Sequence, residues 1–211
     1  MSEGPPPEGT AAEEEERTEP RIRVIKGTPW RIDAARRERW SAEEFVREHA
    51  LEVRQIGDPV LHRPASRPKL PKAELEALVA RMFASMVASN GIGIAAPQIG
   101  VPLKIAIIDV DGAGIVAIEP TIDEISEEIE ETSEGCLSVR GFYGMLERPL
   151  GARLSAADVN GKRFVIEGDE LGAQCMIHET DHLSGTLYID HLRSREDLYP
   201  IRPDETEEVG A

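Results

Sequence analysis

The pentapeptide His178-Glu179-Thr180-Asp181-His182 holds the residues of this chain best suited to metal chemistry. Histidines four residues apart lie on one face of a helix, so both imidazoles can reach a single metal ion. Glu179 stands between them, where it could accept a proton from a water molecule held by that metal. The pattern indicates a metal-dependent hydrolase, although the same string also occurs on solvated helix faces.

We expect the string to lie on a helix from Gly168 to Gly185, with acidic residues in its first turn and glycine as the stop signal. Steps of four, three and four residues place one stripe on the inner face of this helix: Leu171, Cys175, His178 and His182. Histidines that continue an apolar stripe are buried and need polar partners. A metal ion is one such partner, and a hydrogen-bonded core histidine is the alternative.

Cys136, in the string Glu134-Gly135-Cys136-Leu137-Ser138, is the candidate third ligand. The chain has two cysteines, so a disulfide framework is not expected. Cys136 follows a glycine in a turn-like context, where a thiolate could approach a cation. Cys175 is better interpreted as a small buried side chain. A lone cysteine in a loop can also be purely structural.

A third string, Gly91-Ile92-Gly93-Ile94-Ala95-Ala96-Pro97-Gln98-Ile99-Gly100, follows a predicted amphipathic helix that begins near Pro71 and ends at Asn90-Gly91. Its Gly-x-Gly follows a helix and opens none, which argues against dinucleotide binding. The glycines could let the backbone approach a bound peptide, and Gln98 could offer its amide as a donor. Taken alone, the string is also compatible with a tight turn before a strand.

Together the three strings resemble the signature of the peptide deformylase family. That signature reads Gly-x-Gly-x-Ala-Ala-x-Gln, Glu-Gly-Cys-Leu-Ser and His-Glu-x-x-His in this order, and all defining positions are present here. The resemblance extends from about Val53 through Asp190. It implies an α+β fold in which antiparallel or mixed β-sheets wrap around a central metal-binding helix. The implied activity is removal of the N-formyl group from N-formylmethionyl peptides of newly made proteins, with release of formate.

The resemblance implies one divalent metal ion bound by Cys136, His178 and His182, with Glu179 as the general base. Fe2+ is the ion expected in the cell, and Zn2+, Ni2+ or Co2+ are compatible with the purified protein. The Gln98 amide and the Leu137 backbone N–H would stabilise charge on the formyl oxygen. The peptide itself would contact five further residues: Ile92, Gly93, Gly135, Leu171 and Cys175.

Four positions depart from what is usual in the family. Gln174 stands where many relatives carry an aliphatic residue, and Glu119-Pro120 stands where Asn-Pro is usual. Arg140 opens a loop in which a proline is common. Tyr143 takes the place of an arginine that helps relatives to hold the peptide. Substrate preference is therefore less well defined by the resemblance than the metal site.

Length and composition agree with one globular domain that carries tails. Residues 1–20 contain seven acidic residues and one arginine, and we expect them to be disordered. Residues 21–50 are an N-terminal extension with a short helix, residues 51–195 the catalytic domain, and residues 196–211 an acidic C-terminal tail. The extension has no function that the sequence identifies.

The short helix of the extension is expected from Ser41 to Ala50. Ser41 and Glu44 would form a capping box, and Trp40 and Phe45 a hydrophobic staple. Our hypothesis is that the two aromatic side chains dock this helix on the catalytic domain. The basic run before it is interpreted as a solvated face: Arg31, Arg36, Arg37 and Arg39.

The apolar run Leu103 to Ile108 predicts a buried strand, and Asn160-Gly161 predicts a hairpin between Leu154–Val159 and Lys162–Glu167. The segment from Thr121 to Ser133 has isoleucines at helical spacing, but the family resemblance favours strands, and we follow the resemblance.

Asp181 and Arg148 are either a pair that orients the ligand helix or two surface charges. The histidines outside the pentapeptide are interpreted as ordinary surface or packing residues: His49, His62 and His191.

The net charge of −16 argues against affinity for DNA or other nucleic acids, since phosphate contacts need a positive surface. The chain has no apolar run long enough for a membrane span and no signal-peptide pattern, so a bacterial cytoplasm is the expected compartment. The expected partners are N-formylmethionyl nascent peptides, with transient contact to the ribosome.

Two other interpretations of the site stay open. The first is a metallopeptidase that uses the same helix motif on a peptide bond. The second is a relative with a different task, either a specialised deformylase-like protein acting on another formylated substrate or a non-catalytic binding module. Turnover of formylated against unmodified peptides separates these interpretations.

Overall fold

The strand β3 (Ile105–Ile108) shows how the core is organised, because all of its residues are buried. The computed structural model describes residues 21–201. In it, Ile105 and Ile107 pack in the same cluster as helix α3 (Lys72–Ala88), whereas Ile108 packs in the same cluster as helix α4 (Leu171–Ser184). A strand that is covered on both faces needs an uninterrupted apolar sequence, which this run provides.

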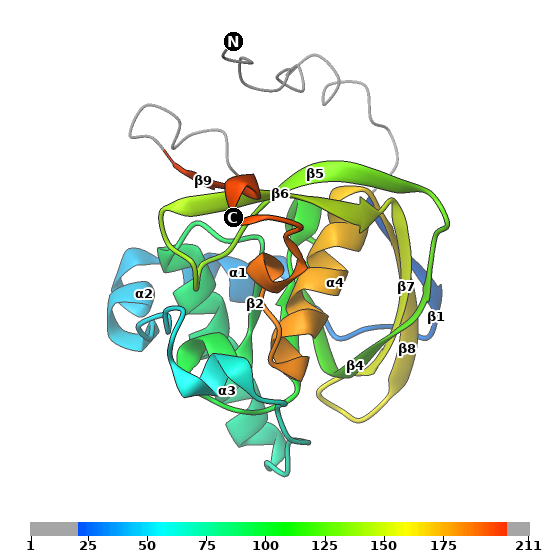
Figure 1. Cartoon of the computed structure of the whole chain (residues 1–211). Helices are drawn as coiled ribbons and strands as arrows, with labels where there is room; N and C mark the ends of the chain where they lie inside the picture. The colour runs from blue at the N-terminus through cyan, green and yellow to red at the C-terminus, as the bar shows by residue number, and fades with distance from the viewer. Residues whose placement is uncertain (1–20, 202–211) are drawn as a thin grey trace.

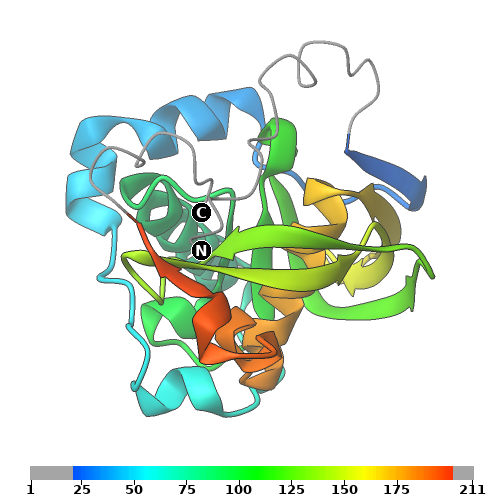
Figure 2. The ribbon, with the colours of Figure 1, turned by 45° about the horizontal axis from the view of Figure 1, so that its top comes forward.

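Two antiparallel sheets surround α4, which lies at the centre of the molecule (Figure 1). The larger sheet has six strands in the order β1 (Ile22–Lys26), β8 (Arg163–Asp169), β7 (Gly151–Ala157), β4 (Ile115–Ile125), β3 and β2 (Gly93–Ala95). The smaller sheet has the order β5 (Ile129–Gly135), β6 (Phe142–Pro149) and β9 (Leu198–Pro200), and its long strands cross the molecule in Figure 2. The α+β fold with sheets wrapped around a central helix is thereby confirmed.

The helices are α1 (Ala34–Ser41), α2 (Glu43–His49), α3 (Lys72–Ala88) and α4 (Leu171–Ser184). Short 3-10 helices connect the larger elements: Pro59–His62, Ala96–Ile99, Val110–Gly112, Tyr188–His191 and Arg195–Asp197. Among the described residues, no helix is long and apolar enough to cross a membrane.

Helix α4 starts three residues later than the sequence predicted. Gly168 and Asp169 still belong to strand β8, and Glu170 stands before the first helical residue with a positive φ of 46°. The predicted end at Gly185 is confirmed, since this residue adopts the left-handed conformation at φ 84°. The first turn packs closely against the chain before β1, because a Cβ on Gly172 would overlap the carbonyl oxygen of Arg21.

The predicted strands are confirmed with small shifts of their ends. The ambiguous segment from Thr121 to Ser133 belongs to β4 and β5, so the extended alternative is right and the helical spacing of its isoleucines is not used. The predicted hairpin is β7–β8, and Gly161 takes a positive φ of 77° in its turn. The strand predicted from Leu103 to Ile108 is shorter in the structure, where β3 begins at Ile105.

The N-terminal extension is part of the same core. Its strand β1 pairs with β8 at the edge of the larger sheet. Trp40 of α1 is 5% exposed, and its ring centroid lies 6.3 Å from that of Phe83 in α3. Phe45 of α2 packs against the same cluster. These contacts agree with the hypothesis that both aromatic residues dock the extension on the rest of the protein.

The predicted capping box at Ser41 is wrong. Ser41 is the last residue of α1, and its hydroxyl donates to the Arg37 carbonyl at 2.8 Å. Helix α1 is capped instead by Asp33, whose carboxylate accepts from the Arg36 N–H at 2.9 Å. The Asp33 cap starts α1 before Ser41, and α2 follows it. The extension therefore contains two short helices in place of the one that was predicted.

The prediction of a solvated face for the basic run is wrong for Arg37. Its guanidinium donates to both carboxylate oxygens of Asp109 at 2.8 and 2.5 Å, and the Asp109 side chain is only 9% exposed. The carboxylate raises the pKa of Arg37. The extension is therefore tied by charge as well as by aromatic packing to the loop that follows β3.

Both predicted tails lie largely outside the described residues, namely 1–20 and 202–211. The described part of the C-terminal segment is held by the smaller sheet. Its strand β9 pairs with β6, and Tyr199 stacks on Tyr143 with 5.4 Å between ring centroids.

We predict that Trp40→Ala lowers the free energy of unfolding by about 3 kcal/mol, because it leaves a large cavity between α1 and α3. Urea denaturation followed by tryptophan fluorescence and circular dichroism measures this change. Val24→Ala is the control, since Val24 is 40% exposed and its truncation should change stability by less than about 0.5 kcal/mol. Equal stability of the two variants would contradict the docking of the extension.

Candidate metal centre

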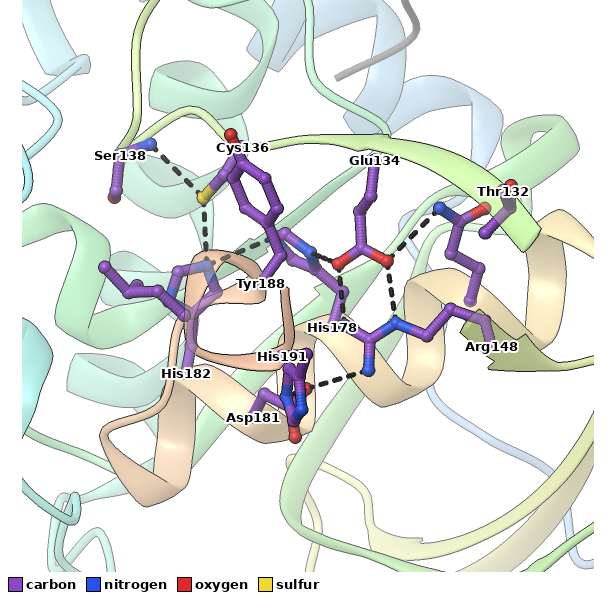
Figure 3. Close-up of polar contacts among 12 residues, drawn as sticks. Thr132, Glu134, Cys136, Ser138, Arg148, His178, Asp181, His182, Tyr188 and His191 are labelled. Atoms are coloured by element: carbon purple, nitrogen blue, oxygen red, sulfur yellow. Dashed lines mark hydrogen bonds and ion pairs between the residues drawn. The ribbon is translucent and has the colours of Figure 1, made fainter. Parts of the chain in front are cut away.

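Three side chains from two elements point their ligand atoms at one another. His178 and His182 lie one turn apart on α4, and Cys136 directly follows the last residue of β5. Figure 3 shows the cysteine sulfur above the two imidazole rings. The sulfur lies 3.3 Å from Nε2 of His182, and that atom lies 3.2 Å from Nε2 of His178. Among the described residues, this group has the chemistry and spacing of a metal site.

The spacing fits a tetrahedral ion. Zinc-type bond lengths of about 2.3 Å to sulfur and about 2.0 Å to nitrogen place tetrahedral ligand atoms about 3.3–3.6 Å apart. The measured separations are close to this range, and a mixed sulfur and imidazole set suits Zn2+ or Fe2+ better than a hard cation. The residues present therefore fit a divalent transition metal.

Glu134 fixes the orientation of His178. Its carboxylate accepts from Nδ1 of His178 at 2.5 Å, which leaves Nε2 of this ring directed at the other two ligands. The same carboxylate accepts two hydrogen bonds from Arg148, from Nε to Oε2 at 2.8 Å and from Nη2 to Oε1 at 2.7 Å. Burial alone would raise the pKa of Glu134, but the hydrogen bonds from Arg148 and His178 outweigh it and lower the pKa to about 2.

The pairing continues from Arg148 to Asp181 at 3.2 Å and from Asp181 to His191 at 2.9 Å (Figure 3). Of the two alternatives for Asp181 and Arg148, the orienting pair is therefore the one that the structure contains. His191, which we interpreted as an ordinary residue, belongs to the outer end of this network.

Glu179 is buried next to the three ligand residues. Its Oε2 has no hydrogen-bond partner among the described residues, and burial raises the pKa of this carboxyl to about 8. The space for it depends on Gly93, because a Cβ there would lie 2.5 Å from Oε1 of Glu179. A buried carboxyl oxygen without a partner is unfavourable in a purely structural site, which points to a role in the chemistry of the site.

Gln98 presents its amide N–H groups to the cysteine loop. Its Oε1 accepts from the Ala95 N–H at 2.7 Å, so the NH2 end must point the other way. Nε2 lies 3.6 Å from the Cys136 sulfur and 3.4 Å from the Ser138 hydroxyl. The Gln98 amide donor is thus directed toward the cysteine loop.

A pocket opens beside the three ligand residues, and the residues predicted to contact the peptide line it. It is lined by Ile92, Gly93, Gln98, Gly135, Leu137, Leu171 and Cys175 together with Ser133, Glu134, Gln174 and three of the central residues, Cys136, His178 and Glu179. His182 lies behind them and is 1% exposed. Burial raises the pKa of the Cys175 thiol well above its usual value, which agrees with its interpretation as a packing residue.

The departures from the family pattern have different structural settings. Gln174 lines the pocket as expected, and its amide donates to the Ser133 carbonyl at 2.9 Å. Tyr143 stacks on Tyr199 instead of lining the pocket. Glu119 has a positive φ of 51°, a conformation that suits asparagine better than glutamate.

Sequence reasoning missed three residues that hold the site in place. Glu134 was part of a recognised string, but its contact with His178 was not anticipated. Ser138 donates its N–H to the Cys136 sulfur at 3.4 Å, and the Gln55 amide donates to the Leu137 carbonyl at 3.0 Å. A glutamate next to a candidate ligand was the one available signal, since ligating histidines commonly donate to carboxylates.

We predict that Glu134→Gln weakens metal affinity by about 10- to 100-fold, because His178 loses a charged acceptor. Competition with a coloured chelator measures the affinity. Glu130→Gln is the matched control, because this glutamate lies on the same strand and is exposed. The same affinity in both variants would contradict the role assigned to Glu134.

Comparison with known proteins identifies the group to which the chain is similar. Residues 50–197 match the family model described as polypeptide deformylase. The peptide deformylase of Acidothermus cellulolyticus is 41% identical over 140 residues, which cover 66% of this chain and 77% of that protein. Peptide deformylase 1 of Streptomyces avermitilis is 38% identical over 173 residues, covering 78% and 80%.

A solved structure gives the same result. The crystal structure of a peptide deformylase from Synechococcus elongatus in complex with actinonin superposes with a TM-score of 0.68 at 36% identity, covering 71% of this chain and 82% of that one. This chain therefore resembles that deformylase in sequence as well as in fold. The chain belongs to the polypeptide deformylase family, whose members are metal-dependent hydrolases that remove the N-formyl group from nascent peptides.

Proposed function

We propose that Cys136, His178 and His182 bind one divalent metal ion and that the pocket beside them receives the formylmethionine end of a nascent peptide. The observation that carries this proposal is the convergence of three ligand atoms within 4.8 Å of one another, next to the buried Glu179, whose Oε2 has no partner among the described residues. A divalent metal held there would acidify a water molecule and polarise the formyl carbonyl.

Glu179 is the proton carrier in this proposal. Its carboxylate takes a proton from the attacking water and gives it to the peptide amine as the C–N bond of the formamide breaks. Formate and a free amino terminus are the products. Its burial beside the three ligand residues, with Oε2 left without a hydrogen-bond partner among the described residues, supports this role.

Gln98 and Leu137 hold the formyl oxygen. Charge develops on this oxygen during attack, and donors aimed at it lower the barrier. The Gln98 amide is fixed by Ala95 and points toward the cysteine loop, and Leu137 follows Cys136 directly. The orientation of the Gln98 amide supports its part in this proposal, and the position of Leu137 next to Cys136 supports the other part.

The methionine side chain would enter between Ile92, Leu171 and Cys175, while the peptide backbone pairs with Gly93 and Gly135. Gln174 adds an amide to this wall, so the pocket is more polar than one lined by an aliphatic residue. Fe2+ is the proposed ion in the cell, as for the family in general. The proposed setting is a bacterial cytoplasm, where nascent chains are made and transient contact with the ribosome would bring the substrate close.

The metallopeptidase alternative is less well supported. A peptidase of the His-Glu-x-x-His type has no use for a thiolate ligand that follows a strand or for the donor pair of Gln98 and Leu137. The presence of Glu179 with all three ligands also argues against a non-catalytic relative.

We predict that Glu179→Ala keeps one metal per chain but lowers kcat by about 10²–10⁴-fold, because the proton carrier is lost. Formate release and metal content are measured on the same sample, with Glu130→Ala as the exposed control. Loss of metal in Glu179→Ala would contradict the separation of ligand and base.

We predict that Gly93→Ala lowers kcat by roughly 10²-fold, since the new Cβ displaces the Glu179 carboxylate by contact at 2.5 Å. Gly151→Ala is the matched control, because the nearest atom to its Cβ lies at an ordinary 3.4 Å. Equal formate release by the two variants would show that Glu179 is not confined by Gly93.

A further inference from the structure

Arg37 connects the N-terminal extension to the wall of the pocket, and the proposed function gives it no role. It lies on α1, before residues 50–197 that match the family model. Its guanidinium donates to both carboxylate oxygens of Asp109, at 2.8 and 2.5 Å. A two-pronged contact of this kind has a fixed geometry as well as a charge, so it defines where the carboxylate lies.

The guanidinium of Arg37 is itself held in place by groups outside α1. It lies over the Phe83 ring of α3, with 5.3 Å between its central carbon and the ring centroid. Its Nη2 also donates to the Gly112 carbonyl at 3.2 Å, in the short helix after β3. Contacts from several elements distinguish this pair from a mobile ion pair on the surface.

Asp109 joins this anchored arginine to the strand that leads into the pocket. Its backbone N–H donates to the Ile92 carbonyl at 2.7 Å, directly after the point where Ile108 pairs with Gly93. Its Oδ1 accepts from the Gly114 N–H at 2.8 Å, so the same side chain closes the turn that follows β3. The backbone donor and the carboxylate of one residue are therefore fixed together.

Ile92 and Cys175 form the part of the pocket wall where the proposed function places the methionine side chain. The Cys175 sulfur lies 3.7 Å from the Ile92 carbonyl oxygen, which is the oxygen that accepts from Asp109. Because protein interiors are close-packed, a shift of this carbonyl also moves the Ile92 side chain.

Loss of the guanidinium would have a local consequence at this wall. The Asp109 side chain is 9% exposed, and without Arg37 its charge would be poorly compensated. A buried carboxylate in that situation moves toward water, because water is the better partner for its charge. The N–H of the same residue would then move away from Ile92.

We propose that Arg37 is a positioning residue for substrate recognition, which holds the Ile92 wall of the pocket against the methionine side chain through Asp109. The proposal rests on the proposed function, since it requires formylmethionine in the pocket. A methionine side chain is long enough to reach this wall, whereas an alanine side chain stops short of it. The N-terminal extension therefore takes part in substrate selection in addition to stabilising the fold.

Formate release from formyl-Met-Gly-Gly and formyl-Ala-Gly-Gly by the full chain loaded with metal tests the proposal. In Arg37→Met, the ratio of kcat/KM for the methionine peptide to that for the alanine peptide falls by about threefold to tenfold, as for partial loss of an apolar contact. The change for the methionine peptide lies in KM, with kcat within about twofold of the unmodified protein. The fraction of folded enzyme cancels in this ratio, because both peptides are measured on one sample.

Two further variants sharpen the test. Arg39→Met is the matched control, because Arg39 is exposed on the same helix and its guanidinium lies over Trp40, so the ratio should stay unchanged. Arg37→Lys keeps the charge and loses the two-pronged geometry, so its ratio should lie between those of the unmodified protein and Arg37→Met. This milder variant also guards against misfolding of Arg37→Met, which a thermal melt reports.

The route through Asp109 is tested by a double variant. If Arg37 acts through this carboxylate, Arg37→Met should not lower the ratio further in an Asp109→Asn background. Effects that multiply in the double variant overturn the proposal, because Arg37 would then act by another route.

An unchanged ratio in both Arg37→Met and Arg37→Lys also overturns the proposal, even where the melting temperature falls, since Arg37 would then serve stability alone. Failure of the unmodified protein to release formate from the methionine peptide contradicts the proposed function instead. The two failures are therefore distinguishable.

Discussion

The buried carboxylate of Glu134, held between His178 and Arg148, is the interaction on which the site depends. It joins the neighbouring strands β5 and β6 to helix α4, which lies much later in the sequence. Cys136 follows two residues after Glu134, so the contact that orients the histidine also sets the position of the cysteine. Removing one partner would leave a buried charge without compensation, which is strongly destabilising. The metal geometry is therefore a consequence of this ion pair as much as of the ligands themselves.

The N-terminal extension also packs around the site, next to the pocket wall at Ile92 and the start of α4. Arg37 holds Asp109, and the N–H of Asp109 donates to the carbonyl of Ile92 in the pocket wall at 2.7 Å. The Arg21 carbonyl lies against Gly172 near the start of the ligand helix. Residues before the family match thus contact the helix that carries the histidines directly and reach the wall of the pocket through Asp109.

The ligand set and the base could be predicted because each lies in a short string whose spacing has a physical reason. His178 and His182 need only the helical repeat, and Glu179 needs only its place between them. The partners of these residues could not be predicted in this way. Glu134 lies 44 residues from His178, and no periodicity connects a strand end with a helix face across such a distance.

The same limit explains the errors in the extension. Ser41 has the residue type of a helix cap, but Asp33 starts a helix earlier and Ser41 closes it. Arg37 belongs to a run of arginines that the sequence predicts to be exposed, and only the fold reveals its partner Asp109, which lies 72 residues away. Pairing of β1 with β8 and of β9 with β6 likewise depends on which sheet edges are free, a property of the finished fold.

Formate release from a short formyl-Met peptide, measured together with metal content on protein purified without oxygen, tests the central claim most directly. A single site with three protein ligands predicts turnover with about one divalent metal per chain. Full metal content without turnover of the formylated peptide would contradict the proposed reaction at this site. Absence of metal after anaerobic loading would contradict the ligand assignment itself.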